Sequence, residues 1–80
     1  MYLIYSKPNC TFCEKAKNLL KQKDIPYKAL NLDQDFTKEE LIDHFQQTHG
    51  IIPRTMPQIV FKDDTKETYI GGFAELEMRV

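Results

Sequence analysis

Two cysteines separated by two residues are the most reactive feature of this sequence, and Cys10 and Cys13 are its only cysteines. A disulfide across so short a loop adds about 2 kcal/mol of stability at most, so the pair is a poor structural crosslink. The pair stands where a helical pattern begins, and the unpaired amides of a helix N-terminus favour a thiolate, which is the nucleophile. We therefore expect Cys10 to react, with Cys13 one turn later within its reach and Lys7 adding positive charge.

Two other interpretations of the cysteine pair stay open: half of a metal site, or buried packing residues. A zinc site needs two more ligands, and only His44 and His49 are available. Thirty residues separate Cys13 from His44, against about 12–15 between the ligand pairs of a zinc finger. Two histidines five residues apart also spread around a helix. We therefore predict no metal site and expect each histidine to be a solvated helix residue.

The size and charge of the chain limit what it can do. Its 80 residues, 41% of them hydrophobic, predict a single domain over 1–80 with one thin core, so any chemistry must lie at the surface. The net charge of −1 argues against nucleic-acid or anionic-membrane binding. The charge is unevenly distributed, because residues 1–30 have a net charge of +4 and residues 31–80 a net charge of −5. Both cysteines lie in the positive part.

The sequence also predicts where the protein works. The apolar stretch 1–5 is too short for the core of a signal peptide, and no stretch approaches the length of a membrane helix. Secreted domains of this size usually carry four to eight cysteines, which this chain lacks. We expect a soluble, cytoplasmic monomer.

Hydrophobic periodicity and turn residues predict the elements that hold the cysteines. The Thr37-Lys38-Glu39-Glu40 sequence is a capping-box pattern, and Gly50 is a natural helix stop. The first two strands should be parallel and the last two an antiparallel hairpin, which makes an α/β fold with a four-stranded mixed sheet flanked by helices. The order is β-α-β-α-β-β-α, with strands at 1–6, 27–32, 58–62 and 67–70 and helices at about 12–22, from 37 to 50, and 73–80.

Three separated signatures make this sequence resemble the glutaredoxins, a family with the thioredoxin fold. The resemblance covers nearly all of the chain, and the signatures are Lys7-Pro8-Asn9-Cys10-Thr11-Phe12-Cys13, Thr55-Met56-Pro57-Gln58-Ile59-Val60-Phe61 and Ile70-Gly71-Gly72-Phe73-Ala74-Glu75-Leu76. It implies a thioredoxin-like fold and a cis peptide bond at Pro57, packed beside the active cysteine. Thr11 departs from the family, which more often has proline between the cysteines.

The resemblance also implies a glutathione site. Lys7 would meet the glycine carboxylate, and Phe12 would line the groove. The backbone of Met56 would pair with the cysteinyl part like an added strand, with Thr55 beside it. The residues that remain candidates for assisting at the glycine carboxylate are Gln46, Gln47 and Arg54.

The last signature would hold the other end of glutathione. Gly72 and Phe73 would offer backbone amides to the γ-glutamyl carboxylate at the start of the final helix. Glu75 would meet the ammonium group, although an acidic residue in the first turn also stabilises a helix by itself. The final helix should have only about two turns.

The function implied is that of a glutathione-dependent thiol–disulfide oxidoreductase. It would reduce protein disulfides and glutathione mixed disulfides, with glutathione as co-substrate and no tightly bound cofactor or metal. Its partners would be disulfide-bearing or glutathionylated proteins, with ribonucleotide reductase as a candidate. Three alternatives stay open: a redoxin reduced by thioredoxin reductase, a dimer bridging an iron–sulfur cluster through Cys10 and glutathione, and a zinc-binding adaptor.

Overall fold

Four strands form one mixed sheet in the order β2-β1-β3-β4 in this computed structural model, which describes residues 1–80. The elements are β1 (Tyr2–Ser6), α1 (Thr11–Gln22), β2 (Tyr27–Asn31), α2 (Lys38–His49), β3 (Gln58–Lys62), β4 (Glu67–Gly71) and α3 (Phe73–Arg79). β1 and β2 are parallel, whereas β3 is antiparallel to both β1 and β4. The predicted element order and mixed four-stranded sheet are confirmed. None of the helices combines the length and apolar character needed to cross a membrane.

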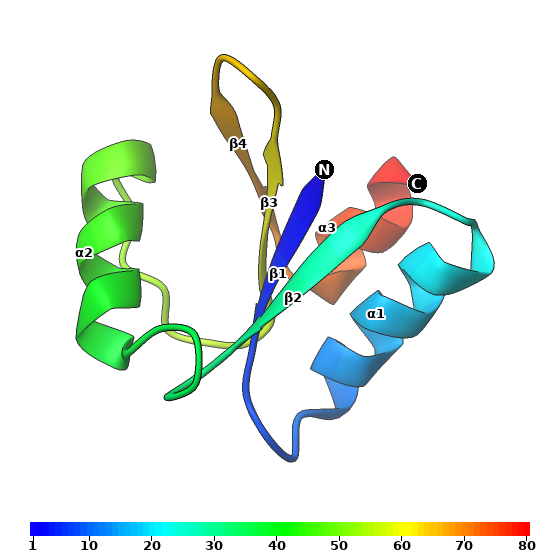
Figure 1. Cartoon of the computed structure of the whole chain (residues 1–80), viewed down its shortest axis with the longest axis horizontal. Helices are drawn as coiled ribbons and strands as arrows, with labels where there is room; N and C mark the ends of the chain where they lie inside the picture. The colour runs from blue at the N-terminus through cyan, green and yellow to red at the C-terminus, as the bar shows by residue number, and fades with distance from the viewer.

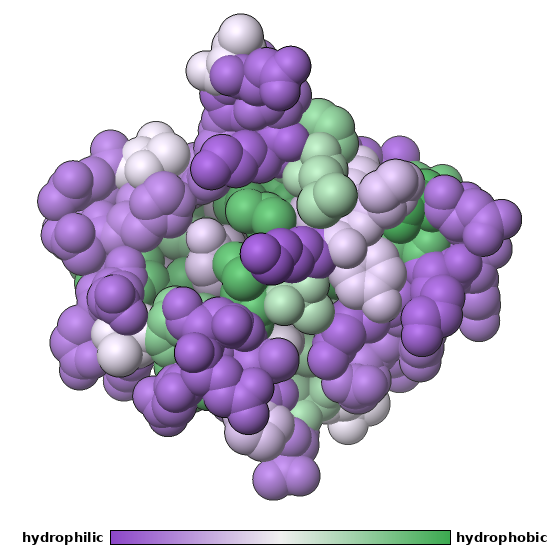
Figure 2. Space-filling model, in the orientation of Figure 1, coloured by the Kyte–Doolittle hydropathy of each residue, from purple (hydrophilic) through white to green (hydrophobic).

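The helices cover both faces of the sheet. α1 and α3 lie on one side and α2 on the other, as Figure 1 shows in blue, red and green. On the first face Ile4, Leu20 and Leu76 are fully buried in one apolar cluster, and on the second Phe45 and Val60 belong to another. Hydrophilic residues cover most of the outer surface, and hydrophobic ones show between them (Figure 2). The core is therefore two thin layers, one on each face.

Local sequence signals place the ends of α2. Thr37 Oγ1 accepts a hydrogen bond from the Glu40 N–H at 3.2 Å, and Glu40 Oε1 accepts one from the Thr37 N–H at 2.8 Å. This is the predicted capping box. The helix ends at Gly50, whose φ of 70° is in the left-handed region that glycine adopts without steric cost. Both predicted ends are confirmed.

The remaining boundaries differ from prediction by about one residue. The second strand stops at Asn31 instead of residue 32, because the chain turns there. The Asn31 N–H donates to the Asp35 carboxylate at 2.8 Å, and Asp33 takes a left-handed φ of 68°. The turn leads the chain across the sheet to the face that α2 covers.

Candidate active site

The cysteine pair lies in the turn from β1 into α1. Asn9 has a left-handed φ of 57°, which side chains such as asparagine tolerate and which reverses the chain after the strand. Cys10 follows as the N-cap of α1, and its Sγ accepts a hydrogen bond from the Cys13 N–H at 3.2 Å. The two cysteines form a disulfide, with their Cα atoms 5.2 Å apart. In the reduced protein the same amide and the helix dipole favour a thiolate at Cys10.

The two sulfur atoms differ in their access to a substrate. Cys10 is partly exposed, whereas Cys13 is fully buried. A disulfide on another molecule can therefore reach Cys10 alone, and Cys13 can attack only a sulfur already attached to Cys10. The geometry favours Cys10 as the nucleophile and Cys13 as the resolving thiol, and that division of roles stays a prediction.

A segment 46 positions further along the chain completes the site. The Met56–Pro57 peptide bond is cis, as the family resemblance implies, and it lies directly before β3. Pro57 is buried, and the Met56 carbonyl oxygen lies 3.7 Å from Cys10 Sγ. The backbone beside this proline is therefore in direct contact with the cysteine that faces solvent.

Most of the predicted glutathione residues line one shallow groove. Its volume is about 380 Å³, and its lining consists of Phe12, Thr55, Met56, Pro57, Gly72, Phe73, Ala74 and Glu75. Phe12 is 54% exposed, and its ring lies 6.0 Å from that of Phe73, centroid to centroid. Residues from three separate signatures thus meet at one surface.

A second hollow continues the groove toward positive charge. Thr55 and Met56 line both hollows, and the second, of about 230 Å³, is also lined by Lys7, Lys38 and Arg54. Its three cationic side chains fit a carboxylate. Of the candidates for assisting Lys7, only Arg54 is brought to this place.

The other two candidates lie elsewhere on α2. Gln47 donates a hydrogen bond to Asp43 at 2.8 Å, and neither Gln46 nor Gln47 lines a hollow. Lys38 was missed by sequence reasoning. The feature that could have indicated Lys38 is its position directly after the N-cap Thr37, at the start of a helix that begins near the groove.

The structure does not support the predicted role of the Gly72 amide in binding the γ-glutamyl carboxylate. Its N–H already donates to Glu75 Oε1 at 2.7 Å, so it is not free for a ligand carboxylate. The contact is half of a capping box, because glycine has no side chain to return the bond. Glu75 therefore caps α3, as the alternative interpretation of this residue holds.

The prediction that each histidine is a solvated helix residue is wrong for His49, whereas the side chain of His44 is 42% exposed. His49 has a side chain only 6% exposed, and the Nε2 atoms of His44 and His49 lie 2.8 and 2.6 Å from the same oxygen of Glu67. Burial raises the pKa of Glu67, but its hydrogen bonds to His49 and His44 outweigh that effect and hold the pKa below its ordinary value. The side chains of both histidines extend from α2 toward Glu67 on β4. Their ring nitrogens therefore come together although the two residues are five positions apart along the helix.

The histidines do not join the cysteines. Cys10 contacts Met56, before the start of β3, whereas Glu67 is paired with Lys62 at the end of that strand. Roughly 15 Å of strand separates the two places. A zinc site made from both cysteines and both histidines is therefore not formed.

The fold and the site together define a thioredoxin-fold protein with a redox-type cysteine pair. A disulfide at the start of α1 faces a cis-proline at the start of β3, on a mixed four-stranded sheet. The glutaredoxin family model matches residues 3–65. The chain belongs to the glutaredoxin family, whose members are thiol–disulfide oxidoreductases.

Curated relatives of the chain include glutaredoxins from distant organisms. It is 35% identical over 70 residues to Glutaredoxin 1 of Rickettsia felis, with 88% of this chain and 62% of the relative covered. It is 32% identical over 73 residues to Glutaredoxin-2 of Schizosaccharomyces pombe, with 91% of this chain and 61% of the relative covered. The chain thus spans about three fifths of the length of these two relatives.

Solved glutaredoxin structures share its fold. Glutaredoxin 1 from Francisella tularensis, complexed with cacodylate, superimposes with a TM-score of 0.72 at 27% identity, covering 98% of this chain and 88% of that one. A buckwheat glutaredoxin–glutathione complex gives a TM-score of 0.71 at 26% identity, covering 98% of this chain and 66% of that one. The thioredoxin-like fold predicted from the sequence is confirmed.

Proposed function

We propose that this protein is a glutathione-dependent oxidoreductase that reduces glutathione mixed disulfides and protein disulfides. The observation that carries the proposal is the unequal pair at the start of α1, where Cys10 is partly exposed and Cys13 is fully buried. The groove beside Pro57 supports glutathione as the co-substrate. So does the structural likeness to a glutaredoxin that was crystallised with glutathione.

The first reaction uses Cys10 alone. Its thiolate attacks the glutathione sulfur of a mixed disulfide, which forms a Cys10–glutathione disulfide and releases the target protein's thiolate. A second glutathione thiolate then attacks the bound glutathione sulfur. Oxidised glutathione leaves and the Cys10 thiolate is regenerated, so each turnover consumes one free glutathione, and the other half of the oxidised glutathione comes from the mixed disulfide.

The second reaction needs both cysteines. Cys10 attacks a protein disulfide and forms a mixed disulfide with one of its sulfurs, releasing the other as a thiolate. Cys13 then attacks Cys10 Sγ, which frees the reduced substrate and closes the Cys10–Cys13 bridge. Two glutathione molecules reopen the bridge in turn. Glutaredoxin potentials near −200 to −230 mV lie close to that of the cytoplasmic glutathione pool, so we propose that compartment for the protein.

Glutathione would lie along the groove with its glycine end in the cationic hollow. The Met56 backbone would bond the cysteinyl part, while Lys7 and Arg54 meet the glycine carboxylate. Phe73 offers the backbone amide for the γ-glutamyl carboxylate in place of Gly72. The protein substrates would be disulfide-bearing or glutathionylated proteins acted on by a monomer, and ribonucleotide reductase is one to assay.

Serine variants of the cysteines test the mechanism. Cys10→Ser should abolish both reactions, whereas Cys13→Ser should still release glutathione from mixed disulfides and lose protein-disulfide reduction. The assay follows NADPH oxidation with glutathione and glutathione reductase, then with thioredoxin reductase in their place. Equal loss of both reactions in Cys13→Ser would contradict the roles given to the cysteines. Turnover with thioredoxin reductase alone would contradict glutathione dependence.

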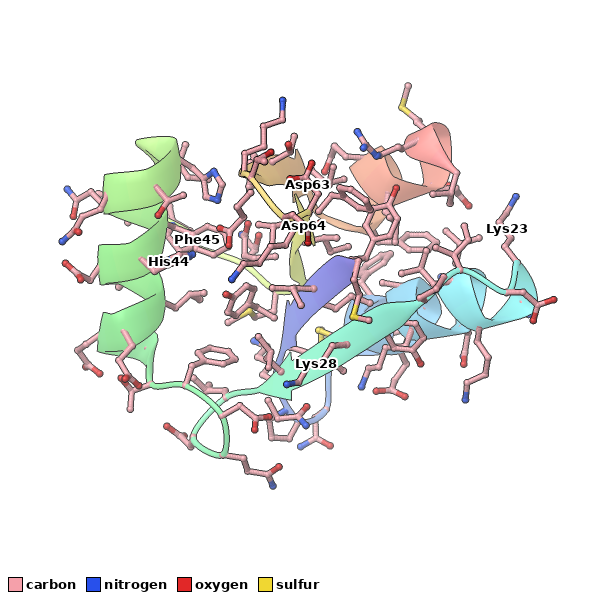
Figure 3. The ribbon with its side chains drawn as sticks, turned by 45° about the horizontal axis from the view of Figure 1, so that its top comes forward. Lys23, Lys28, His44, Phe45, Asp63 and Asp64 are labelled. Carbon is pink, nitrogen blue, oxygen red and sulfur yellow. A yellow bond between two sulfur atoms is a disulfide. The ribbon has the colours of Figure 1, made fainter.

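Charge-removing variants test where glutathione binds. Lys7→Gln and Arg54→Gln should each raise KM for glutathione roughly two- to fivefold, the effect of losing an exposed ion pair of about 0.5–1 kcal/mol. The matched control is Lys28→Gln, because Lys28 is an exposed lysine on β2 (Figure 3) and lines none of the hollows. An equal change in KM for all three variants would contradict a specific cationic site and indicate general electrostatic attraction.

A further inference from the structure

The histidine cluster on the face that α2 covers has the composition of a metal site. Two histidines come from α2 and Glu67 from β4, and their ligand atoms lie within 4.8 Å of one another. Both imidazole Nε2 atoms approach one carboxylate oxygen, at 2.8 Å from His44 and 2.6 Å from His49. These side chains are remote from the cysteines and have no part in the redox mechanism.

The surroundings of the cluster are closed on one side and open on the other. The side chains of His49 and Glu67 are 6% and 9% exposed, whereas that of His44 is 42% exposed. Aromatic rings form the closed side: Phe45 lies 5.3 Å and Tyr69 5.7 Å from the His49 ring, centroid to centroid. In Figure 3, His44 and Phe45 are seen where α2 faces the sheet. A small ion can enter beside His44 while the rings exclude water behind it.

Two imidazoles and one carboxylate are a ligand set that zinc uses in proteins. His₂Glu sites bind Zn²⁺ with three protein ligands and leave one position for water. Ions that prefer oxygen ligands, such as Mg²⁺, are poorly served by two nitrogens. Tetrahedral Zn²⁺ with bonds near 2.0–2.1 Å places its ligand atoms about 3.4 Å apart. To reach that geometry the N···O pairs must separate by less than about 1 Å, and the two nitrogens, which lie within 4.8 Å of each other, must approach by at most about 1.4 Å.

We propose that His44, His49 and Glu67 bind one divalent transition-metal ion of the zinc class, with water at the open position beside His44. Each histidine uses Nε2, which leaves Nδ1 of His44 near the Thr48 hydroxyl at 3.5 Å. A metal-bound Nε2 carries no proton, so the neutral His44 ring would hold its proton on Nδ1, where the Thr48 hydroxyl can accept it. Metal binding therefore connects α2 to the edge strand β4.

The ion should stabilise the folded chain, because its three ligands come together only when α2 packs on β4. The test uses the oxidised protein, in which the Cys10–Cys13 disulfide prevents the sulfurs from binding metal. Calorimetry should show one Zn²⁺ bound per chain, and the melting temperature should rise with Zn²⁺ and stay unchanged with Mg²⁺. Co²⁺ should give visible absorption bands of low-symmetry coordination.

Single substitutions locate the ion. His44→Gln and Glu67→Gln should each weaken Zn²⁺ binding at least tenfold, since each removes one of three ligands. Asp64→Asn is the control: it removes an exposed carboxylate from the same hairpin without touching a histidine (Figure 3). It should leave the affinity within twofold. Circular dichroism checks that each variant folds. If Glu67→Gln does not fold, the Zn²⁺ affinity of His44→Gln decides, because the side chain of His44 is partly exposed and its replacement should not disturb folding.

Two results would overturn the metal site. The first is the absence of one-to-one Zn²⁺ binding by the oxidised protein, which would make the cluster an ordinary set of hydrogen bonds that joins α2 to β4. The second is Zn²⁺ binding of equal affinity in wild type, His44→Gln and Glu67→Gln, which would place the ion elsewhere. Neither result concerns the cysteine chemistry, so the metal site and the proposed redox function are tested independently.

Discussion

Glu75 offers the sharpest test of how the groove is built, because one carboxylate lies where it can serve both the helix and a ligand. Its Oε1 accepts the Gly72 N–H at 2.7 Å, and the same residue lines the groove. Glu75→Gln keeps an oxygen that can accept this hydrogen bond and removes the charge. Glu75→Ala removes both. Glu77→Gln, an exposed residue of the same helix, is the control.

The structure sets the expected stability changes. Losing a cap bond costs about 1 kcal/mol, and α3 has only seven residues with Leu76 fully buried, so the loss should be felt by the whole domain. In a domain of this size that lowers the melting temperature by roughly 4–8 °C. Glu75→Gln should lose only the interaction of the charge with the helix dipole, about 0.5 kcal/mol. Glu77→Gln should change little.

The expected effect on glutathione is different. Glu75 is exposed, so an ion pair with the γ-glutamyl ammonium is worth about 0.5–1 kcal/mol, or roughly a two- to fivefold change in KM. Glu75→Gln and Glu75→Ala should therefore raise KM for glutathione by the same factor while their melting temperatures differ. The measurements are thermal melts followed by circular dichroism and initial rates over a range of glutathione concentrations.

Two outcomes would refute this reasoning about Glu75. A wild-type KM in Glu75→Gln means that the carboxylate serves only the helix, and the predicted contact with glutathione is lost. A wild-type melting temperature in Glu75→Ala means that the bond to Gly72 contributes nothing to folding, and the short helix is then held by Leu76 alone.

Three further predictions concern stability, each measured by denaturant unfolding. Phe45→Ala should cost about 3–5 kcal/mol, because a fully buried ring is lost; a cost below 1 kcal/mol would show that the face under α2 repacks. Thr37→Ala should cost about 1 kcal/mol and Thr37→Ser much less, since serine keeps the cap bond to Glu40; equal losses would contradict the capping role. Asp63 accepts hydrogen bonds from the backbone N–H groups of Thr65 and Lys66, which hold its pKa below the ordinary 3.8. The charge of Asp63 should therefore stabilise the hairpin at neutral pH, and the difference from Asp63→Asn should disappear as the pH falls through the lowered pKa; a difference that stays constant down to pH 2 would contradict this.

Local patterns in the sequence predicted most of the fold. The capping box at Thr37 and the stop at Gly50 bounded α2 correctly, because cap bonds form between residues three or four apart. The position of Cys10 at a helix start followed in the same way from its neighbours. The parallel pairing of β1 with β2 followed from the rule that a strand, a helix and a second strand form a right-handed parallel unit, whereas the place of β3 beside β1 was not predicted.

The prediction of the groove depended on the resemblance to a family as much as on the residues themselves. Phe12, Met56 and Phe73 come from three separated segments, and no periodicity within any of them predicts that they meet. Lys38 shows the limit of this approach, since it joins Lys7 and Arg54 only through the way α2 begins beside the loop before β3.

The sequence by itself determined the elements, their order and the position of the cysteines at the start of a helix, because these depend on neighbours along the chain. The tertiary structure alone decided which sulfur is exposed, that Glu75 occupies the Gly72 amide, and that His44, His49 and Glu67 converge. The physical reason is distance along the chain. Contacts between residues 18 or 46 positions apart arise from how helices pack on the sheet, and spacing within one helix cannot reveal them.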